Sequence, residues 1–359
     1  MKSRKKKGLS ISEGVKQTPS NINPRLKQRK GTGLMSSEEY TKGILDGNRV
    51  ILSQAITLIE SKLPIHQELA QQVLDACLPY SGQSFRLGIT GSPGVGKSTF
   101  IERFGASLLE ENKKISILAI DPSSQLTKGS ILGDKTRMES LSRSEHVFIR
   151  PTPSGHTLGG VARKTRETII LCEAAGFDTI IIETVGVGQS EIAVHSMVDF
   201  FLLLILPGGG DELQGIKRGI VEMADMIAVN KADGDRLVLA KQAKRAYQNA
   251  LHLFPPKDSG WIPPVVLCSG NTGMGIKDIY EQLSDYIQLT QQNSFFNKKR
   301  SAQAKYWLQE TIQQRLRQLF FTHPAVKQRL PAIEKAILEG DISPFQGAEE
   351  LLQLFDHKK

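Results

Sequence analysis

The chain has 359 residues, of which 39% are hydrophobic and 23% charged, as is typical of a soluble globular protein of two or three domains. Its net charge of +9 comes from the first 30 residues, where ten Lys and Arg accompany a single acid, Glu13. The other 36 of its 46 basic residues are balanced by 36 of its 37 acidic residues. The body is therefore neutral, and a basic surface for nucleic acid is not supported.

Targeting signals and cysteine usage indicate the cellular compartment of the protein. No run comes near the ~20 apolar residues of a membrane span, and no apolar stretch follows the basic N-terminus, so neither a span nor a secretory signal is expected. The leader is rich in Lys rather than in Arg and Ser, which argues against a transit peptide. Cys77, Cys172 and Cys268 lie far apart without metal-ligand spacing, which indicates free thiols. We expect a cytoplasmic protein.

The first 82 residues precede the predicted core. Residues 1–35 are polar, basic and rich in Gly, Pro, Ser and Asn, which predicts disorder. A solubilising leader is favoured there over a tail that contacts an acidic partner or nucleic acid. Residues 36–82 are predicted to form an N-terminal helical extension. It contains one helix over 37–60, capped by Ser36 or Ser37, and another over 65–78 that begins after Pro64.

Residues 83–293 alternate short apolar runs with amphipathic helical stretches. This pattern predicts an α/β fold with a mainly parallel sheet covered on both faces, and a ligand beyond the carboxyl ends of the strands. The expected strands are 85–89, 115–120, 147–149, 180–182, 200–206, 226–229 and 265–267. The expected helices are 99–109, 158–175, 212–223, 235–250 and 276–287.

A complete phosphate-binding loop follows the first of these strands. Its pattern, G-x-x-x-x-G-K-[ST], is filled by Gly91, Ser92, Pro93, Gly94, Val95, Gly96, Lys97 and Ser98, and Thr99 continues into the helix. A strand, a Gly-rich turn and a helix direct backbone N–H groups and the positive helix end at phosphate oxygens. Lys97 is expected to bridge the β- and γ-phosphates and Ser98 to ligate Mg²⁺. The loop predicts a nucleoside triphosphate binder, that is, a P-loop NTPase.

The base is predicted to be guanine. Asn230, Lys231 and Asp233 fill the pattern N-K-x-D at a strand end, where the Asp carboxylate can accept from guanine N1–H and N2–H₂. Asn230 would contact the polar edge of the base and the Lys231 stem would cover its face. Ser269 and Gly270 follow the last core strand, where a backbone N–H would reach guanine O6.

The metal and hydrolysis residues are less sharply marked. Glu183 and Gly186 stand where GTPases place D-x-x-G, so the carboxylate would hold Mg²⁺ and the glycine N–H would meet the γ-phosphate. Asp121 and Asp134 are further candidates for the metal shell. The position that orients water in Ras-like enzymes is Val187, with Gln189 two residues on, which predicts slow unaided hydrolysis. No arginine finger is evident, although loop movement could bring Arg137 or Arg150 near.

Residues 294–359 are predicted to be helical again, over 306–321, 326–338 and 345–355. The first stretch carries Leu308, Ile312, Leu316 and Leu319 on one face. Apolar stripes of this kind are usually buried against another surface. Packing into the core of the same chain and a dimer interface are the two alternatives.

Together these motifs resemble the methylmalonyl-CoA mutase-associated GTPases (the MeaB/MMAA type, also known as ArgK transport kinases). The stretches that carry the resemblance are 119–124, 129–138, 159–163, 183–191 and 210–217, and the similarity runs from about residue 39 to the C-terminus. Departures are small. Lys128 stands where glycine is common, and Gly270 replaces an alanine in the guanine loop.

The resemblance implies a P-loop GTPase of the metallocofactor-chaperone class, usually a homodimer through C-terminal helices, that assists an adenosylcobalamin-dependent acyl-CoA mutase in cofactor loading, protection and reactivation. It implies Mg²⁺ contacts from Ser98, Asp121, Asp134 and Glu183, and a further switch segment over 211–217 that ends at Lys217. Lys97, Glu183, Gly186 and Lys217 are the expected catalytic residues.

Alternatives remain. A transport-system protein kinase lacks an evident acceptor site, and guanine specificity argues against it. A nickel-insertion GTPase would need a Cys/His cluster that the sequence lacks. A different cobalamin mutase as client stays open, because no motif names the client.

Overall fold

The computed structural model describes residues 34–120, 138–152, 158–184, 190–208 and 218–356. The chain divides into two units, Met1–Ser36 and Ser37–Lys359, and all helices and strands named here belong to the second. Several predicted site and switch positions lie outside the described residues: Asp121, Asp134, Arg137, Gly186, Val187, Gln189 and Lys217.

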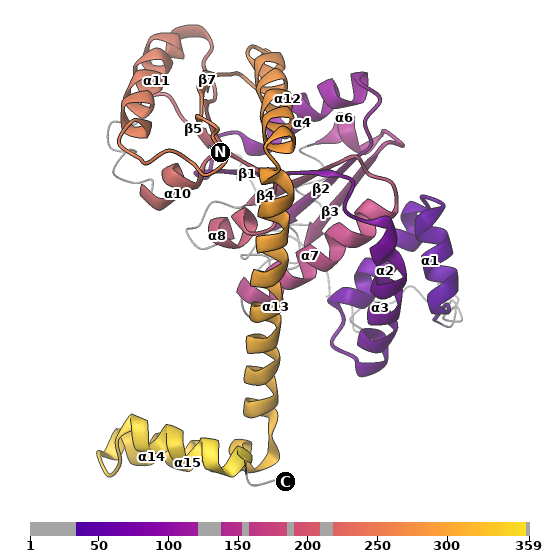
Figure 1. The fold of residues 1–359 in the computed structure, drawn as a ribbon, viewed down its shortest axis with the longest axis vertical. Helices are drawn as coiled ribbons and strands as arrows, with labels where there is room; N and C mark the ends of the chain where they lie inside the picture. The colour runs from indigo at the N-terminus through magenta and orange to yellow at the C-terminus, as the bar shows by residue number, and fades with distance from the viewer. Residues whose placement is uncertain (1–33, 121–137, 153–157, 185–189, 209–217, 357–359) are drawn as a thin grey trace, which may run out of the picture. The chain divides into compact units, whose positions relative to one another are not determined.

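Seven parallel strands form one sheet in the order β3-β2-β4-β1-β5-β6-β7 (Figure 1). They are β1 (Phe85–Gly91), β2 (Ile115–Ile120), β3 (Val147–Thr152), β4 (Thr179–Thr184), β5 (Phe200–Ile205), β6 (Met226–Val229) and β7 (Val265–Leu267). Every residue of β2, β4 and β5 is buried, because helices cover both faces of the sheet. The predicted α/β architecture is confirmed, and the phosphate-loop strand β1 lies in the middle.

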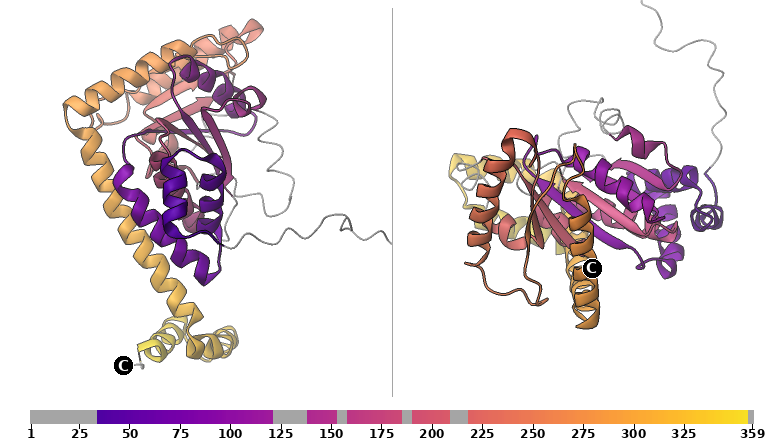
Figure 2. Two further views of the ribbon diagram at one scale, coloured as in Figure 1. Left: turned by 90° about the vertical axis from the view of Figure 1, so that its right-hand side faces the viewer. Right: turned by 90° about the horizontal axis from the view of Figure 1, so that it is seen from above.

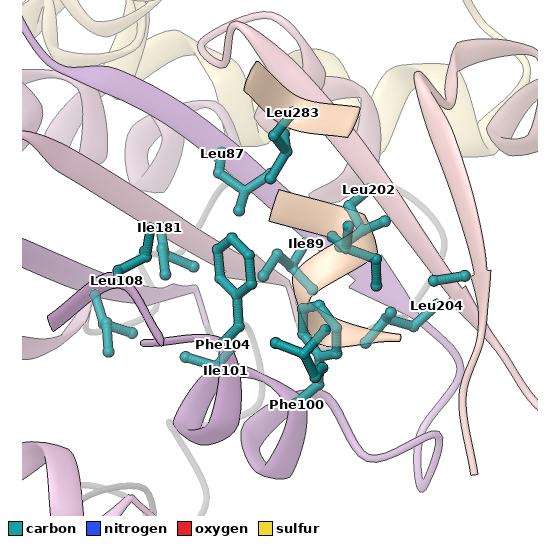
Figure 3. Close-up of a cluster of buried hydrophobic side chains, with 14 of the residues drawn as sticks. Leu87, Ile89, Phe100, Ile101, Phe104, Leu108, Ile181, Leu202, Leu204 and Leu283 are labelled. Carbon is teal, nitrogen blue, oxygen red and sulfur yellow. The ribbon is translucent and has the colours of Figure 1, made fainter. Parts of the chain in front are cut away.

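Alternate residues of the strands serve the two faces. Leu202 and Leu204 join the core beneath α4 (Lys97–Glu110), α6 (Glu139–Ser142) and α12 (Ile276–Gln292), whereas Leu203 and Ile205 join the core on the opposite face. Figure 3 shows the α4 side chains among the strand residues, with Leu283 of α12 beside Leu87. The other face carries α7 (Leu158–Ala174), α8 (Ser190–His195), α10 (Arg218–Met223) and, after the 3₁₀ turn Gly234–Arg236, α11 (Leu237–Leu251).

The N-terminal extension contains α1 (Ser37–Leu45), α2 (Arg49–Glu60) and α3 (Pro64–Cys77), followed by a 3₁₀ turn. The single helix predicted over 37–60 is therefore wrong. Gly47 adopts a φ of +73°, and the Asn48 side chain caps α2 by accepting from the N–H groups of Val50 and Ile51. A left-handed glycine followed by an asparagine cap ends one helix and begins another.

The C-terminal region contains α13 (Phe295–Thr322), α14 (Pro324–Glu339) and α15 (Pro344–Asp356). α14 and α15 pack on each other (Figure 2). Val326, Ile333 and Leu351 form the buried cluster between them. The predicted stripe on α13 is open, since Leu308, Ile312, Leu316 and Leu319 are each between 43% and 62% exposed. Of the two alternatives for this stripe, packing into the core is therefore wrong in the described part of the chain.

Among the described residues, no helix combines the length and apolar character needed to cross a membrane.

Candidate nucleotide-binding site

The phosphate loop lies between β1 and the first turn of α4, as its motif predicts. Gly96 adopts a φ of +95°, and a Cβ at this position would stand 2.9 Å from the Asn230 side-chain nitrogen. A Cβ on Gly91 would stand 2.4 Å from the Leu204 carbonyl oxygen. Glycines are therefore required where the loop approaches β5 and the base motif. Ser92, Pro93 and Thr99 complete the same turn and the start of the helix.

Lys97 is buried in this loop. Its Nζ donates to the carbonyl oxygens of Gly91 at 2.7 Å and Ser92 at 3.2 Å. Burial lowers the Lys97 pKa, and the carboxylates of Glu183 and Glu191 act against that shift. The ammonium is thus held over the loop by neutral carbonyls, which a phosphate oxygen could replace as a stronger, charged acceptor.

Glu183 reaches the loop from the next strand. β4 pairs with β1 in a register that sets Glu183 opposite Ile89, two residues before the loop begins. Its Oε1 accepts from the Ser98 hydroxyl at 3.4 Å. A hydroxyl and a carboxylate at this separation are hard oxygen donors of the kind that Mg²⁺ takes together with phosphates and water.

The base motif contacts the phosphate loop directly. The Asn230 Nδ2 donates to the Val95 carbonyl at 2.8 Å, and its Oδ1 accepts from the Gly270 N–H at 3.1 Å. Lys231, at a φ of +58°, donates from Nζ to the Gly94 carbonyl at 2.7 Å. The structure thus brings the loop after β6 against the phosphate loop and the loop after β7 against Asn230, at the strand ends where a shared ligand site was predicted.

Asp233 faces the loop after β7. The Ser269 hydroxyl donates to its Oδ2, and the same Oγ accepts from the Thr272 N–H at 3.1 Å. The carboxylate that is expected to contact guanine is therefore already oriented without ligand. Gly270 is buried and lies against the backbone of α4.

Several residues at the site were given no role of their own by the sequence motifs. Thr184 donates to the Thr90 hydroxyl at 2.8 Å, and this buried bond ties the end of β4 to the start of the phosphate loop. Glu191 is 3% exposed in the first turn of α8 and acts electrostatically on Lys97. Strand spacing could have suggested Thr90 and Thr184 as neighbours only once the strand order was known.

Arg150 does not serve as a mobile arginine. It lies on β3 and donates from Nη1 to Ser53 at 3.1 Å and from Nη2 to Thr57 at 3.3 Å and Glu60 at 2.5 Å. The structure does not favour the possibility that loop movement brings Arg150 near the γ-phosphate, because three side chains of α2 hold its guanidinium.

Comparison with known proteins agrees with this geometry. The family model for the methylmalonyl Co-A mutase-associated GTPase MeaB matches residues 52–325. A putative GTPase from Caulobacter vibrioides is 49% identical over 87% of this chain and 95% of its own length. The mitochondrial methylmalonic aciduria type A homolog from Mus musculus is 45% identical over 88% of this chain and 78% of its own length, and the GTPase ArgK from Escherichia coli is 44% identical over 87% and 95%.

A solved structure supports the same assignment. The chain is similar to the crystal structure of an LAO/AO transport system kinase with a TM-score of 0.72, at 36% identity, over 89% of this chain and 99% of the other. Motif, fold and relatives agree, and the chain belongs to the MeaB family of methylmalonyl Co-A mutase-associated GTPases.

Proposed function

We propose that this GTPase binds the triphosphate of GTP through residues 91–99 and its base through Asn230, Asp233 and the loop at 269–270. The observation that carries the proposal is that Asn230 links the two base loops to the phosphate loop, because its side chain donates to the Val95 carbonyl and accepts from the Gly270 N–H. One nucleotide can therefore contact the phosphate loop with its phosphates and the two base loops with its base. Lys97 would neutralise charge on the β- and γ-phosphates where it now binds carbonyls.

The metal proposal concerns Mg²⁺. Ser98 and Glu183 fit it through a hydroxyl and a carboxylate oxygen 3.4 Å apart, with Asp121 and Asp134 as further proposed ligands. When bound, Mg²⁺ would neutralise charge that develops on the phosphate oxygens during transfer. The chain's own part is to hold Glu183 in place, through the β4 register and the adjacent Thr184 hydroxyl.

The base assignment is tested with Asp233→Asn. The amide presents donors to guanine N1–H and N2–H₂, so GTP affinity should fall by ~2–4 kcal/mol while xanthosine triphosphate affinity rises. Equilibrium binding of both nucleotides measures this switch. A variant that keeps its GTP affinity and does not gain the xanthine nucleotide would place the base elsewhere.

We also infer that the protein assists an adenosylcobalamin-dependent acyl-CoA mutase, methylmalonyl-CoA mutase being favoured, in cofactor loading, protection and reactivation. The family description, which names association with that mutase, supports this role. The kinase wording of one solved structure and the ArgK relative keep a transport-system kinase as the alternative, beside a different cobalamin mutase as client. Purification from the native cell should recover a mutase; recovery of a transport protein instead would favour the alternative.

The mutase is proposed to control hydrolysis. Val187 offers no water-orienting side chain, so unaided turnover should lie within about a hundredfold of the ~10⁻⁴ s⁻¹ of an unassisted Ras-like enzyme. Adding the cognate mutase should raise it by about tenfold or more. Lys217→Ala should reduce that gain at unchanged GTP affinity. Single-turnover assays decide, and a rate above ~1 s⁻¹ for the isolated protein would show that its machinery is already complete.

We also propose that the protein forms a homodimer through residues 294–359. Its expected compartment is the cytoplasm. The open stripe of Leu308, Ile312, Leu316 and Leu319 supports a second copy as the cover of α13. Leu308→Glu with Leu316→Glu should give a monomer by sedimentation that still binds GDP, since the proposed nucleotide residues all precede α13. A double variant that stays dimeric would move the interface elsewhere.

A further inference from the structure

The loop that follows β7 is fastened to α4, the helix that begins with Lys97. Gly270 lies so close to this helix that a Cβ there would stand 3.1 to 3.2 Å from backbone atoms of Thr99 and Phe100. Arg103, one turn further along α4, donates from Nη2 to the Asn271 carbonyl at 2.9 Å and from Nε to the Gly270 carbonyl at 3.4 Å. The guanidinium thus holds two consecutive carbonyls of one loop.

These bonds fix the direction of the following N–H groups. Because a trans peptide is planar, the Thr272 N–H points opposite to the Asn271 carbonyl that Arg103 holds. That N–H donates to the Ser269 Oγ at 3.1 Å. Because an ionised carboxylate can only accept, the Ser269 hydroxyl that the Thr272 N–H holds in place donates its own proton to Asp233.

We propose that Arg103 is a positioning residue for base recognition, which acts on Asp233 through the Asn271–Thr272 peptide and the Ser269 hydroxyl. The inference rests on the proposal that Asp233 binds guanine and extends it to a residue outside every nucleotide-binding motif of the sequence. Arg103 itself is exposed on α4, so its replacement leaves the core intact.

The test is a comparison of ligands in Arg103→Ala. GDP affinity should fall about 3- to 10-fold, the range for one net hydrogen bond, because the Asp233 carboxylate loses its fixed orientation. ADP has the same phosphates but lacks the N1–H and N2–H₂ donors, so its weak affinity should not change. Arg103→Lys, which keeps a donor for one carbonyl, should recover part of the GDP affinity.

A matched control removes a positive charge near the same loop that makes no hydrogen bond of the Arg103 kind to the loop carbonyls. Lys277 lies at the start of α12, just beyond the same loop, and pairs with Glu281 at 3.9 Å. Lys277→Ala should leave both nucleotide affinities as they are. An equal loss for GDP and ADP in Arg103→Ala, or no loss for either, would overturn the inference.

A double-mutant cycle traces the route. In an Asp233→Ala background, Arg103→Ala should cost GDP affinity nothing further, because the group that it positions is absent. A persisting loss would show that Arg103 acts elsewhere, and would overturn the inference. The xanthine switch of Asp233→Asn is read separately, so that its failure would count against the guanine site itself and not against Arg103 alone.

Discussion

The two ends of the sheet use their charged side chains differently. At the carboxyl ends of the strands, Lys97 donates to neutral carbonyls and Ser98 meets Glu183 at 3.4 Å. At the amino ends, Arg86 makes a bidentate pair with Glu173 at 2.8 and 3.0 Å. The first set keeps contacts that a ligand can replace, whereas the second satisfies its partners within the fold.

The amino-end network also ties α13 to the sheet. Arg300 donates from Nε and Nη2 to the Asp199 carboxylate at 2.8 and 2.7 Å, and Lys299 lies 3.5 Å from Asp225. The Trp307 indole donates to the Ser196 carbonyl at 3.0 Å. The part of α13 before its open stripe is therefore fastened to the nucleotide-binding core by partly buried cations that pair with the buried carboxylates of Asp199 and Asp225.

This contrast teaches that a buried charge points to ligand binding where it contacts neutral groups that a ligand can replace, and to fold stability where it belongs to a closed ion pair. Saturated pairs such as Arg86 with Glu173 stabilise the fold, and removing one partner leaves a costly buried charge. At the carboxyl ends Lys97 and Glu183 hydrogen-bond to neutral carbonyl and hydroxyl groups, and their removal should affect ligand binding first. The variants below test that separation of roles.

The largest effect is expected for Lys97→Ala. Two charge-assisted hydrogen bonds to phosphate are lost, which corresponds to ~3–6 kcal/mol of GTP binding. The free energy of unfolding without nucleotide should change little, because burial of the Lys97 ammonium is itself unfavourable. Titration calorimetry and denaturant unfolding measure the two quantities. A large fall in the free energy of unfolding with unchanged GTP affinity would show that Lys97 stabilises the fold and does not bind phosphate.

Glu173→Gln should have the opposite profile. It removes the charge that pairs with Arg86, and the free energy of unfolding should fall by about 3–5 kcal/mol. GDP affinity of the folded fraction should stay as in the parent chain. The Lys335 and Glu339 pair on α14, exposed and 3.6 Å apart, is the control, and Glu339→Gln should cost less than about 0.5 kcal/mol.

The amino end should also make stability depend on pH through His195. Burial lowers the His195 pKa to about 4, with the charges of Lys299 and Lys257 acting in the same direction and that of Asp225 against it. The unfolded chain takes up this proton below about pH 6.5. Stability is therefore fully present above that pH and is lost as the pH falls toward 4.

The expected loss over that window is up to about 3 kcal/mol. His195→Phe keeps an aromatic ring against Phe201 and should flatten the pH dependence between 6.5 and 4.5. Urea unfolding at a series of pH values measures it. Below this window Glu173 adds a loss of its own: burial raises its pKa, but the Arg86 bonds and charge outweigh burial, so the pKa lies below its usual value. If stability falls equally steeply with pH in the parent chain and in His195→Phe, a group other than His195 causes the acid sensitivity.

The smallest effect is expected for Thr184→Val at the carboxyl end. It leaves the buried Thr90 hydroxyl without its partner, which should cost about 1–2 kcal/mol of stability. Because Thr184 adjoins Glu183, the variant should also need more Mg²⁺ for GTP binding. Thr184→Ser restores the hydroxyl and should recover both properties; loss of stability alone would reduce this pair to a structural role.

The sequence by itself determined the fold class, the strands and the two nucleotide motifs. Glycines, Lys97 and the N-K-x-D residues are local signals, since each motif requires its residue types within a few positions of one another. Parallel strands must end at one edge, so their polar termini were expected to meet there. Gly47 and Asn48 are also a local signal for a helix break, but the helical apolar periodicity continues on either side of them and predicted a single helix.

Only the tertiary structure decided which distant residues share a contact. Arg103 touches the loop at 270–271 from 167 positions away, and Arg150 pairs with Glu60 from 90 positions away. The exposure of the α13 stripe likewise depends on which face of a 28-residue helix meets the core. Such contacts follow from strand order and helix packing, which bring together side chains that carry no common sequence signal.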